Sequence, residues 1–150
     1  MKKLKIIVVL VTLAASSLIF ASDEIKWVSL KDGMEKAKAL KKPMIVDFYF
    51  GKGCARCEAL QKGVYDNPSI ARKIMADFIP IKIDLTKKLS DEERKLGNQY
   101  DFKNDCLLLF LDNNGTIIRD PGGKSLCFVS TVEPQWFVKY LDMIKARYNK

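Results

Sequence analysis

Four cysteines and the absence of histidine restrict the chemistry that this 150-residue chain can perform. Without an imidazole there is no Ser–His–Asp or Cys–His catalysis and no histidine-ligated metal. Cys54 and Cys57 are separated by two residues. At this spacing one thiolate can attack a disulfide, and the second thiol can resolve the mixed disulfide that forms. The same spacing makes half of a zinc site, so the motif alone leaves thiol–disulfide exchange and metal binding open.

The sequence on either side of this motif predicts where the two cysteines lie in the fold. Residues 44–50 form an apolar run rich in β-branched and aromatic side chains, typical of a strand buried on both faces. A glycine-containing break and then helix formers follow, so Cys54 is expected at a helix N-terminus, where backbone N–H groups stabilise a thiolate. Lys52 and Arg56 add positive charge that should lower the pKa of the Cys54 thiol. Cys57, one turn further on, is expected to be less exposed and to act as the resolving thiol.

Asp47 interrupts the apolar run of this strand. An acid among buried side chains is costly unless it has a partner or a role in the chemistry. We therefore treat Asp47 as a candidate functional residue, with a partnered structural acid as the alternative.

The remaining hydrophobic pattern predicts a single α/β domain, in which helices flank a central mixed sheet on both faces. The predicted strands are residues 25–28, 44–50, 78–84, 107–111 and 116–118, with extended character again at 126–129. The predicted helices cover residues 30–40, a segment from Cys54 onward, a segment from Pro68 onward, residues 90–99 and a segment from Pro134 onward. We expect the aromatic side chains of Trp27, Trp136, Phe137 and Tyr140 in the core.

The first 21 residues predict export. Residues 1–5 are basic, and the apolar run from Ile6 to Ala21 is short for a membrane-spanning helix. We expect a signal peptide over residues 1–21 and one domain over residues 22–150, located in the periplasm or secreted. An uncleaved leader that anchors the chain is the alternative.

The charge pattern argues against a nucleic-acid partner. The formal net charge of +8 falls to +5 without the three lysines of the leader. The remaining lysines and arginines are interspersed with acids and do not form a basic stripe. We expect membrane contact only through an uncleaved leader.

Several segments between Trp27 and Tyr140 carry a family resemblance. They are Lys42–Pro43, Val46–Tyr49, the Cys54–Cys57 motif, Asp66–Pro68, and Leu107–Leu111 followed by Asp112 and Gly115. In these segments the chain resembles thioredoxin-like proteins, above all periplasmic ones and the C-terminal domain of Dsb-type transmembrane reductases. The resemblance implies a thioredoxin fold with a C-terminal β-hairpin and helix, and thiol–disulfide exchange with protein substrates without an added cofactor. It also implies that Asp47 assists proton transfer at Cys57 and that a membrane thiol reductase supplies electrons.

Two positions depart from the family pattern. Gly53 stands where the family has tryptophan, immediately before the first cysteine. The family also has a cis-proline before the strand that corresponds to residues 107–111, and this chain has none there. Asp105 and Cys106 occupy the neighbourhood of that proline, and their backbone groups are the expected contacts for an extended substrate.

Cys106 and Cys127 must be weighed together. A hairpin between them would allow a second disulfide or a second redox pair, which an oxidising compartment and an even cysteine count favour. Buried free thiols are the alternative, and a third is that all four cysteines bind zinc or an iron–sulfur cluster.

The function predicted from the sequence is an exported thiol–disulfide oxidoreductase. Two opposed arguments bear on whether the protein oxidises or reduces its substrates. Positive charge at Lys52 and Arg56 favours the reduced dithiol and so an oxidant, whereas the family resemblance favours a reductant. We expect the reductive direction. The alternatives are a cysteine-ligated metal protein and a binding module that keeps the fold without catalysis.

Overall fold

The computed structural model describes residues 23–100, 108–119, 121–123 and 133–149. Their elements follow the order α1, β1, α2, η1, α3, β2, α4, β3, α5, where η1 is a π-helical segment. Within these residues, no helix is long and apolar enough to cross a membrane.

A three-stranded mixed sheet of order β2-β1-β3 forms the centre of the fold. The central strand β1 (Met44–Tyr49) pairs in parallel with β2 (Ile79–Asp84) and antiparallel with β3 (Leu108–Leu111). In the parallel pair, Asp47 lies opposite Lys82. This register brings an acid and a lysine together in the middle of the sheet.

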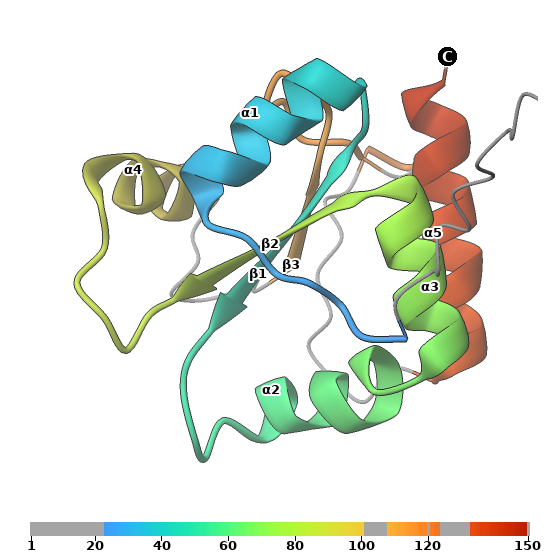
Figure 1. The fold of residues 1–150 in the computed structure, drawn as a ribbon, viewed down its shortest axis with the longest axis horizontal. Coiled ribbons are helices and arrows are strands. Elements are labelled where there is room, and N and C mark those ends of the chain that lie inside the picture. The colour runs from blue at the N-terminus through green and yellow to red at the C-terminus, as the bar shows by residue number, and fades with distance from the viewer. Residues whose placement is uncertain (1–22, 101–107, 120, 124–132, 150) are drawn as a thin grey trace, which may run out of the picture.

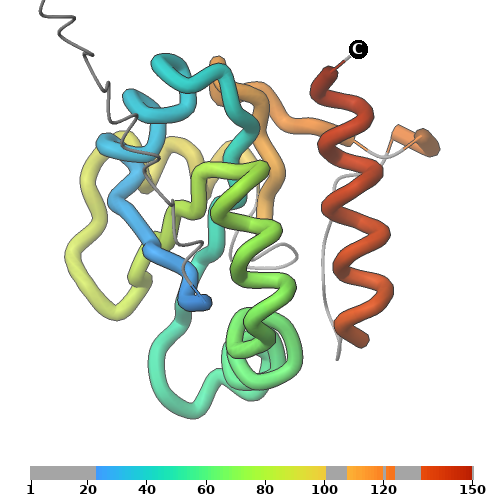
Figure 2. Tube along the Cα trace, turned by 45° about the vertical axis from the view of Figure 1, so that its right-hand side comes forward, coloured from blue at the N-terminus to red at the C-terminus, as the bar shows by residue number. Residues whose placement is uncertain are grey.

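Helices cover both faces of this sheet (Figure 1). They are α1 (Leu30–Leu40), α2 (Ala55–Leu60), α3 (Pro68–Asp77), α4 (Asp91–Gln99) and α5 (Pro134–Tyr148), with η1 (Gln61–Tyr65) continuing α2. On one face, Ile45 and Phe110 join a buried cluster with η1, α3 and α5. On the other face, Val46 and Leu109 pack with α1 and with Leu96 of α4. Figure 2 shows α3 and α5 running side by side. The predicted α/β fold is confirmed.

Local sequence signals explain where three of the helices begin. Ser29 caps α1 by accepting a hydrogen bond from the Asp32 N–H, and Asn67 caps α3 immediately before Pro68. Ser90 begins α4 with a complete capping box, in which its side chain and that of Glu93 each bond the other's backbone N–H. These starts match the predicted ones.

Two predicted strands are shorter than expected. Within residues 25–28 only Val28 pairs, through a single bridge to Ile81. The Trp27 N–H donates instead to the Ile25 carbonyl oxygen at 3.2 Å, and Ser29 already caps α1. The hairpin after β3 is likewise a turn closed by one bridge between Leu111 and Ile117. The predicted extended segment 126–129 lies outside the described residues.

One expected core residue is exposed. Trp136 is 58% exposed, whereas Phe137, Leu141 and Ile144 of the same helix are fully buried. These buried positions are spaced by four and three residues, so they lie on one face of the helix. Trp136 is one residue before Phe137 and therefore lies on another side of the helix. The expectation of a core Trp136 was wrong. Its ring contacts Lys139, whose Nζ lies 4.5 Å from the ring centre.

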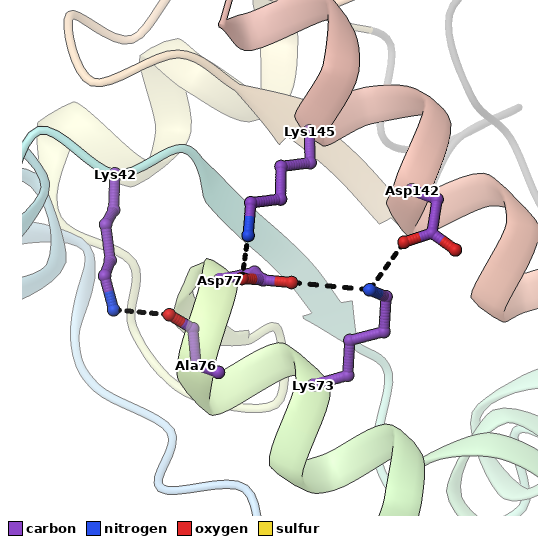
Figure 3. Close-up of polar contacts among 6 residues, drawn as sticks. All are labelled: Lys42, Lys73, Ala76, Asp77, Asp142 and Lys145. Carbon is purple, nitrogen blue, oxygen red and sulfur yellow. Dashed lines mark hydrogen bonds and ion pairs between the residues drawn. The ribbon is translucent and has the colours of Figure 1, made fainter.

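An ion-pair network joins α3 to α5 (Figure 3). Asp77 of α3 pairs with Lys145 of α5, and Lys73 of α3 pairs with Asp142 of α5 at 2.5 Å. Lys73 Nζ also lies 3.4 Å from Asp77, so the four side chains alternate in charge across the helix contact. Burial raises the pKa of Asp77, but the two lysines outweigh that effect and hold it below its usual range.

Candidate active site

The two cysteines of the motif form a disulfide at the start of α2, just beyond the loop that leaves β1 (Figure 1). Their Cα atoms are 5.2 Å apart. Cys54 is the N-cap residue of α2, and the Cys57 N–H donates a hydrogen bond of 3.2 Å to Cys54 Sγ. Both cysteines are half-buried.

The loop between β1 and α2 depends on two glycines. Gly51 and Gly53 have φ angles of +93° and +87°, in the left-handed region where side chains cause strain. A Cβ on Gly51 would also lie 2.6 Å from Thr86 Cγ2. The Leu85 N–H donates to the Tyr49 carbonyl oxygen at 2.9 Å. The turn after β2 therefore packs against the loop that leads to the cysteines.

Asp47 is the buried acid of the site, with 6% of its surface exposed. Burial raises its pKa from the ordinary 3.8 to about 6, while the positive charges of Lys82 and Arg56 oppose part of this rise. Lys82 Nζ lies 3.8 Å from Asp47 Oδ2. A carboxyl with a pKa of about 6 can both accept and release a proton near neutral pH.

Lys82 is a residue of the site that the sequence interpretation missed. Its Nζ lies 4.4 Å from the ring centre of Trp27, 5.6 Å from that of Tyr49 and 5.8 Å from that of Tyr65. These aromatic faces stabilise the ammonium group beside the Asp47 carboxylate. The sequence did contain a signal, which is a lysine inside the apolar pattern of residues 79–84. Lys82 is the fourth residue of β2, and Asp47 is the fourth residue of β1.

The predicted charge-tuning residues lie at a hollow beside the cysteine pair. Phe50, Lys52, Gly53, Cys54 and Arg56 line it. Lys52 is exposed, and Arg56 is half-buried. Burial lowers the pKa of Arg56, and the charge of Asp47 opposes this shift. The structure thus places Arg56 within electrostatic reach of both the cysteine pair and the buried acid.

The other predicted site residues cannot be placed. Asp105, Cys106 and Cys127 lie outside the described residues. Among the residues that are described, no group of three or more cysteine, aspartate and glutamate side chains is arranged to hold a metal ion.

Comparison with known proteins supports the fold. The model of a family described as thioredoxin-like matches residues 26–110. A search of curated proteins finds no match. Three similar solved structures are DsbH oxidoreductase, a thioredoxin from Thermus thermophilus and the reduced C-terminal domain of DsbD from Neisseria meningitidis.

These three structures share the fold at low sequence identity. DsbH is 17% identical with a TM-score of 0.62, over 83% of this chain and 88% of its own. The Thermus thioredoxin is 17% identical with a TM-score of 0.58, over 81% of this chain and 87% of its own. The Neisseria domain is 19% identical with a TM-score of 0.53, over 75% of this chain and 91% of its own.

Proposed function

Because the chain belongs to the thioredoxin-like family, we propose that it is a thiol–disulfide oxidoreductase that reduces protein disulfides through Cys54 and Cys57. The observation that carries this proposal is the Cys54–Cys57 disulfide at the start of α2, preceded in the chain by the buried carboxyl of Asp47. The two cysteine sulfurs hold the two electrons that the reaction transfers, so the proposed reaction needs no added cofactor.

The proposed reaction has two steps at sulfur. The Cys54 thiolate attacks one sulfur of the substrate disulfide, which forms a mixed disulfide and releases the first substrate thiolate. Cys57 then gives its proton to the Asp47 carboxylate, and the Cys57 thiolate attacks Cys54 Sγ. The Cys54–Cys57 disulfide forms and the second substrate thiolate leaves. Two electrons have passed to the substrate, and one proton remains on Asp47.

The raised pKa of Asp47 supports its role as the base in the second step. A carboxyl at its ordinary pKa is a weak acceptor for a thiol proton, and general bases work best when their pKa lies near the working pH. With a pKa of about 6, Asp47 is largely ionised at pH 7 and a stronger base than an exposed carboxylate.

The proposal includes export, an electron donor and a substrate contact. The basic start and apolar run of residues 1–21 support a signal peptide and a location in the periplasm or outside the cell. A membrane thiol reductase is the proposed donor, and the shared fold with the DsbD domain supports that type of partner. Extended substrate is proposed to bind backbone groups at Asp105 and Cys106.

A redox titration with alkylation and peptide mapping tests the proposal. Reversible titration of Cys54 and Cys57 as a pair is expected, with a midpoint nearer about −270 mV than about −120 mV for a reductant. The same map shows whether Cys106 and Cys127 form a stable disulfide or a second titrating pair. If all four cysteines resist alkylation until a chelator is added, the chain is a metal protein and the proposal fails.

Two matched serine variants assign the roles. Cys57→Ser should accumulate a mixed disulfide with substrate at Cys54, because the resolving thiol is missing. Cys54→Ser should lose reductase activity and trap nothing. A Cys54→Ser variant that keeps activity would show that another thiol attacks the substrate.

A further inference from the structure

Phe50 is an exposed aromatic side chain in the loop that leads from β1 to the cysteine pair. It directly follows β1, and 42% of its surface is exposed. A single exposed apolar side chain is common on a protein surface and needs no explanation by itself. Among the described residues, Leu40 and Trp136 are the other large hydrophobic side chains that are exposed, and neither of them lines the hollow at Cys54. Phe50 does line this hollow, so an apolar ring lies next to the reactive cysteine.

The hollow has room for the side chains of a substrate. Its volume is about 430 Å³, within the range of pockets that bind small ligands. A Cβ on Gly53 would meet no atom within 4 Å, so the space over the loop directly before Cys54 is open. The glycine at this position therefore leaves a substrate chain free to approach Cys54.

The charged side chains at this hollow are positive. Lys52 and Arg56 line it, and no acid is among its described lining residues. Lys52 is exposed and forms no ion pair with any residue that the structure describes. Arg56 is half-buried, and its charge also acts on Asp47. A carboxylate that enters the hollow is therefore attracted by two cations and meets no opposing acid in the lining.

We propose that this hollow selects the substrate, and that Cys54 reacts preferentially with disulfides whose cysteine is flanked by acidic and apolar side chains. This inference rests on the proposed function and names its substrate class. Lys52 and Arg56 are each two residues from Cys54 in the chain, so they contact the part of a substrate that is nearest its own cysteine. These two cations attract the substrate carboxylates, and Phe50 packs against the apolar side chain.

Three blocked peptides of symmetrical sequence test this selection, because their reaction does not depend on the direction in which they bind. They are Leu-Glu-Cys-Glu-Leu, Leu-Gln-Cys-Gln-Leu and Ser-Glu-Cys-Glu-Ser, each as a disulfide with 2-mercaptoethanol. The reduced full-length chain transfers two electrons to the disulfide, which releases the peptide thiol and 2-mercaptoethanol and forms the Cys54–Cys57 disulfide. Acid quenching, alkylation and mass spectrometry give the rate constants. Each is divided by the rate constant of dithiothreitol with the same peptide, which removes the intrinsic reactivity of the disulfide.

The unchanged chain should distinguish the peptides in two ways. It should reduce Leu-Glu-Cys-Glu-Leu about fivefold faster than Leu-Gln-Cys-Gln-Leu at low ionic strength, because the carboxylates pair with Lys52 and Arg56. In about 1 M salt this ratio should fall below about twofold, because salt screens the attraction between exposed charges. Leu-Glu-Cys-Glu-Leu should also react about threefold faster than Ser-Glu-Cys-Glu-Ser at both ionic strengths, because salt does not screen the burial of apolar surface against Phe50.

Matched variants assign the two preferences to their residues. Lys52→Gln should lower the preference for glutamate to about twofold. Any change that it causes in the reactivity of Cys54 affects all three peptides alike and cancels in the ratio. Phe50→Ser should remove the preference for leucine. Lys38→Gln and Leu40→Ser remove the same kinds of side chain from α1, outside the hollow, and should leave both ratios unchanged.

Several results would overturn the inference. They are equal corrected rates for the three peptides, a preference for glutamate that is undiminished in about 1 M salt or in Lys52→Gln, and a preference for leucine that is undiminished in Phe50→Ser. The comparison of peptides on the unchanged chain does not depend on the folding of any variant. The proposed function fails separately if the chain reduces none of the peptides, or if Cys54→Ser reduces them as fast.

Discussion

Replacing Asp47 with asparagine should make the protein more stable at neutral pH. In the unfolded chain this carboxyl has its ordinary pKa of 3.8, and in the folded protein burial raises the pKa to about 6. Between these values the folded state binds the proton more tightly than the unfolded state. Stability therefore falls as the pH rises from about 4 through about 6, and above that the folded protein carries a buried, ionised carboxylate.

The size of this effect follows from the two pKa values. Each tenfold change in proton affinity corresponds to about 1.4 kcal/mol, so a rise from 3.8 to about 6 costs about 3 kcal/mol at pH 7 and above. Asparagine has nearly the shape of the protonated acid and avoids this cost. The attraction of Lys82 for the carboxylate is already contained in the folded pKa of about 6, so it is not subtracted again. We expect a net gain of about 3 kcal/mol at pH 7.5.

Urea unfolding at pH 4.0 and pH 7.5 measures this difference, with Cys54 and Cys57 kept as the disulfide in both proteins. The variant and the unchanged chain should be nearly equally stable at pH 4.0, where Asp47 is protonated in the folded state. The gain should appear only at pH 7.5. A variant that is destabilised at pH 7.5, or a difference that is the same at both pH values, would refute the electrostatic argument and make Asp47 a structural residue.

Three further substitutions test other parts of the structure. Asp77→Asn should destabilise the protein at pH 7 by about 1–3 kcal/mol in urea unfolding, and the loss should vanish as the pH falls through the lowered pKa of Asp77, because the ion pairs need its charge. Lys52→Glu should slow attack of Cys54 on an anionic disulfide about fivefold in low salt, with little difference in 1 M salt, as stopped-flow rates at two ionic strengths would show. Gly33→Ala should cost about 1–3 kcal/mol in the same unfolding assay, because the added methyl group would overlap the Ile81 side chain; equal stability would show that this contact relaxes freely.

Local patterns in the sequence predicted most of the fold. The capping box at Ser90 and the Asn67–Pro68 pair gave two helix starts, because caps depend on neighbouring residues only. The apolar run of residues 44–50 gave the central strand and the position of the cysteine motif after it. Trp136 was misplaced because a helix face shifts by about 100° with each residue, and helical spacing alone did not fix which side faces the sheet.

The rest of the site depends on contacts between distant segments. The pairing of Lys82 with Asp47 follows from the parallel register of β2 on β1, which a sequence pattern does not fix. Tyr65 is placed by η1, where the Asp66 N–H donates to the Gln61 carbonyl oxygen at 2.8 Å. A π-turn adds a residue to the helical repeat and changes which side chains face the core. No single residue type in the sequence predicts such a turn.

The exceptions to ordinary packing are concentrated on one side of β1. Among the residues that the structure describes, the buried cluster on that face consists of apolar and aromatic side chains, yet beside it lie a buried acid, a lysine among aromatic rings and a hydroxyl without a hydrogen-bond partner. The acid Asp77, by contrast, lies between two lysines that lower its pKa, as a stabilising ion pair should. The lysines beside Asp77 lower its pKa despite its burial. Burial of Asp47 outweighs the effect of Lys82 and Arg56 and raises its pKa to about 6, close to neutral pH. A protein selected for stability alone would lose such a group, so its presence on the strand that leads to the cysteine pair supports the proposed proton transfer.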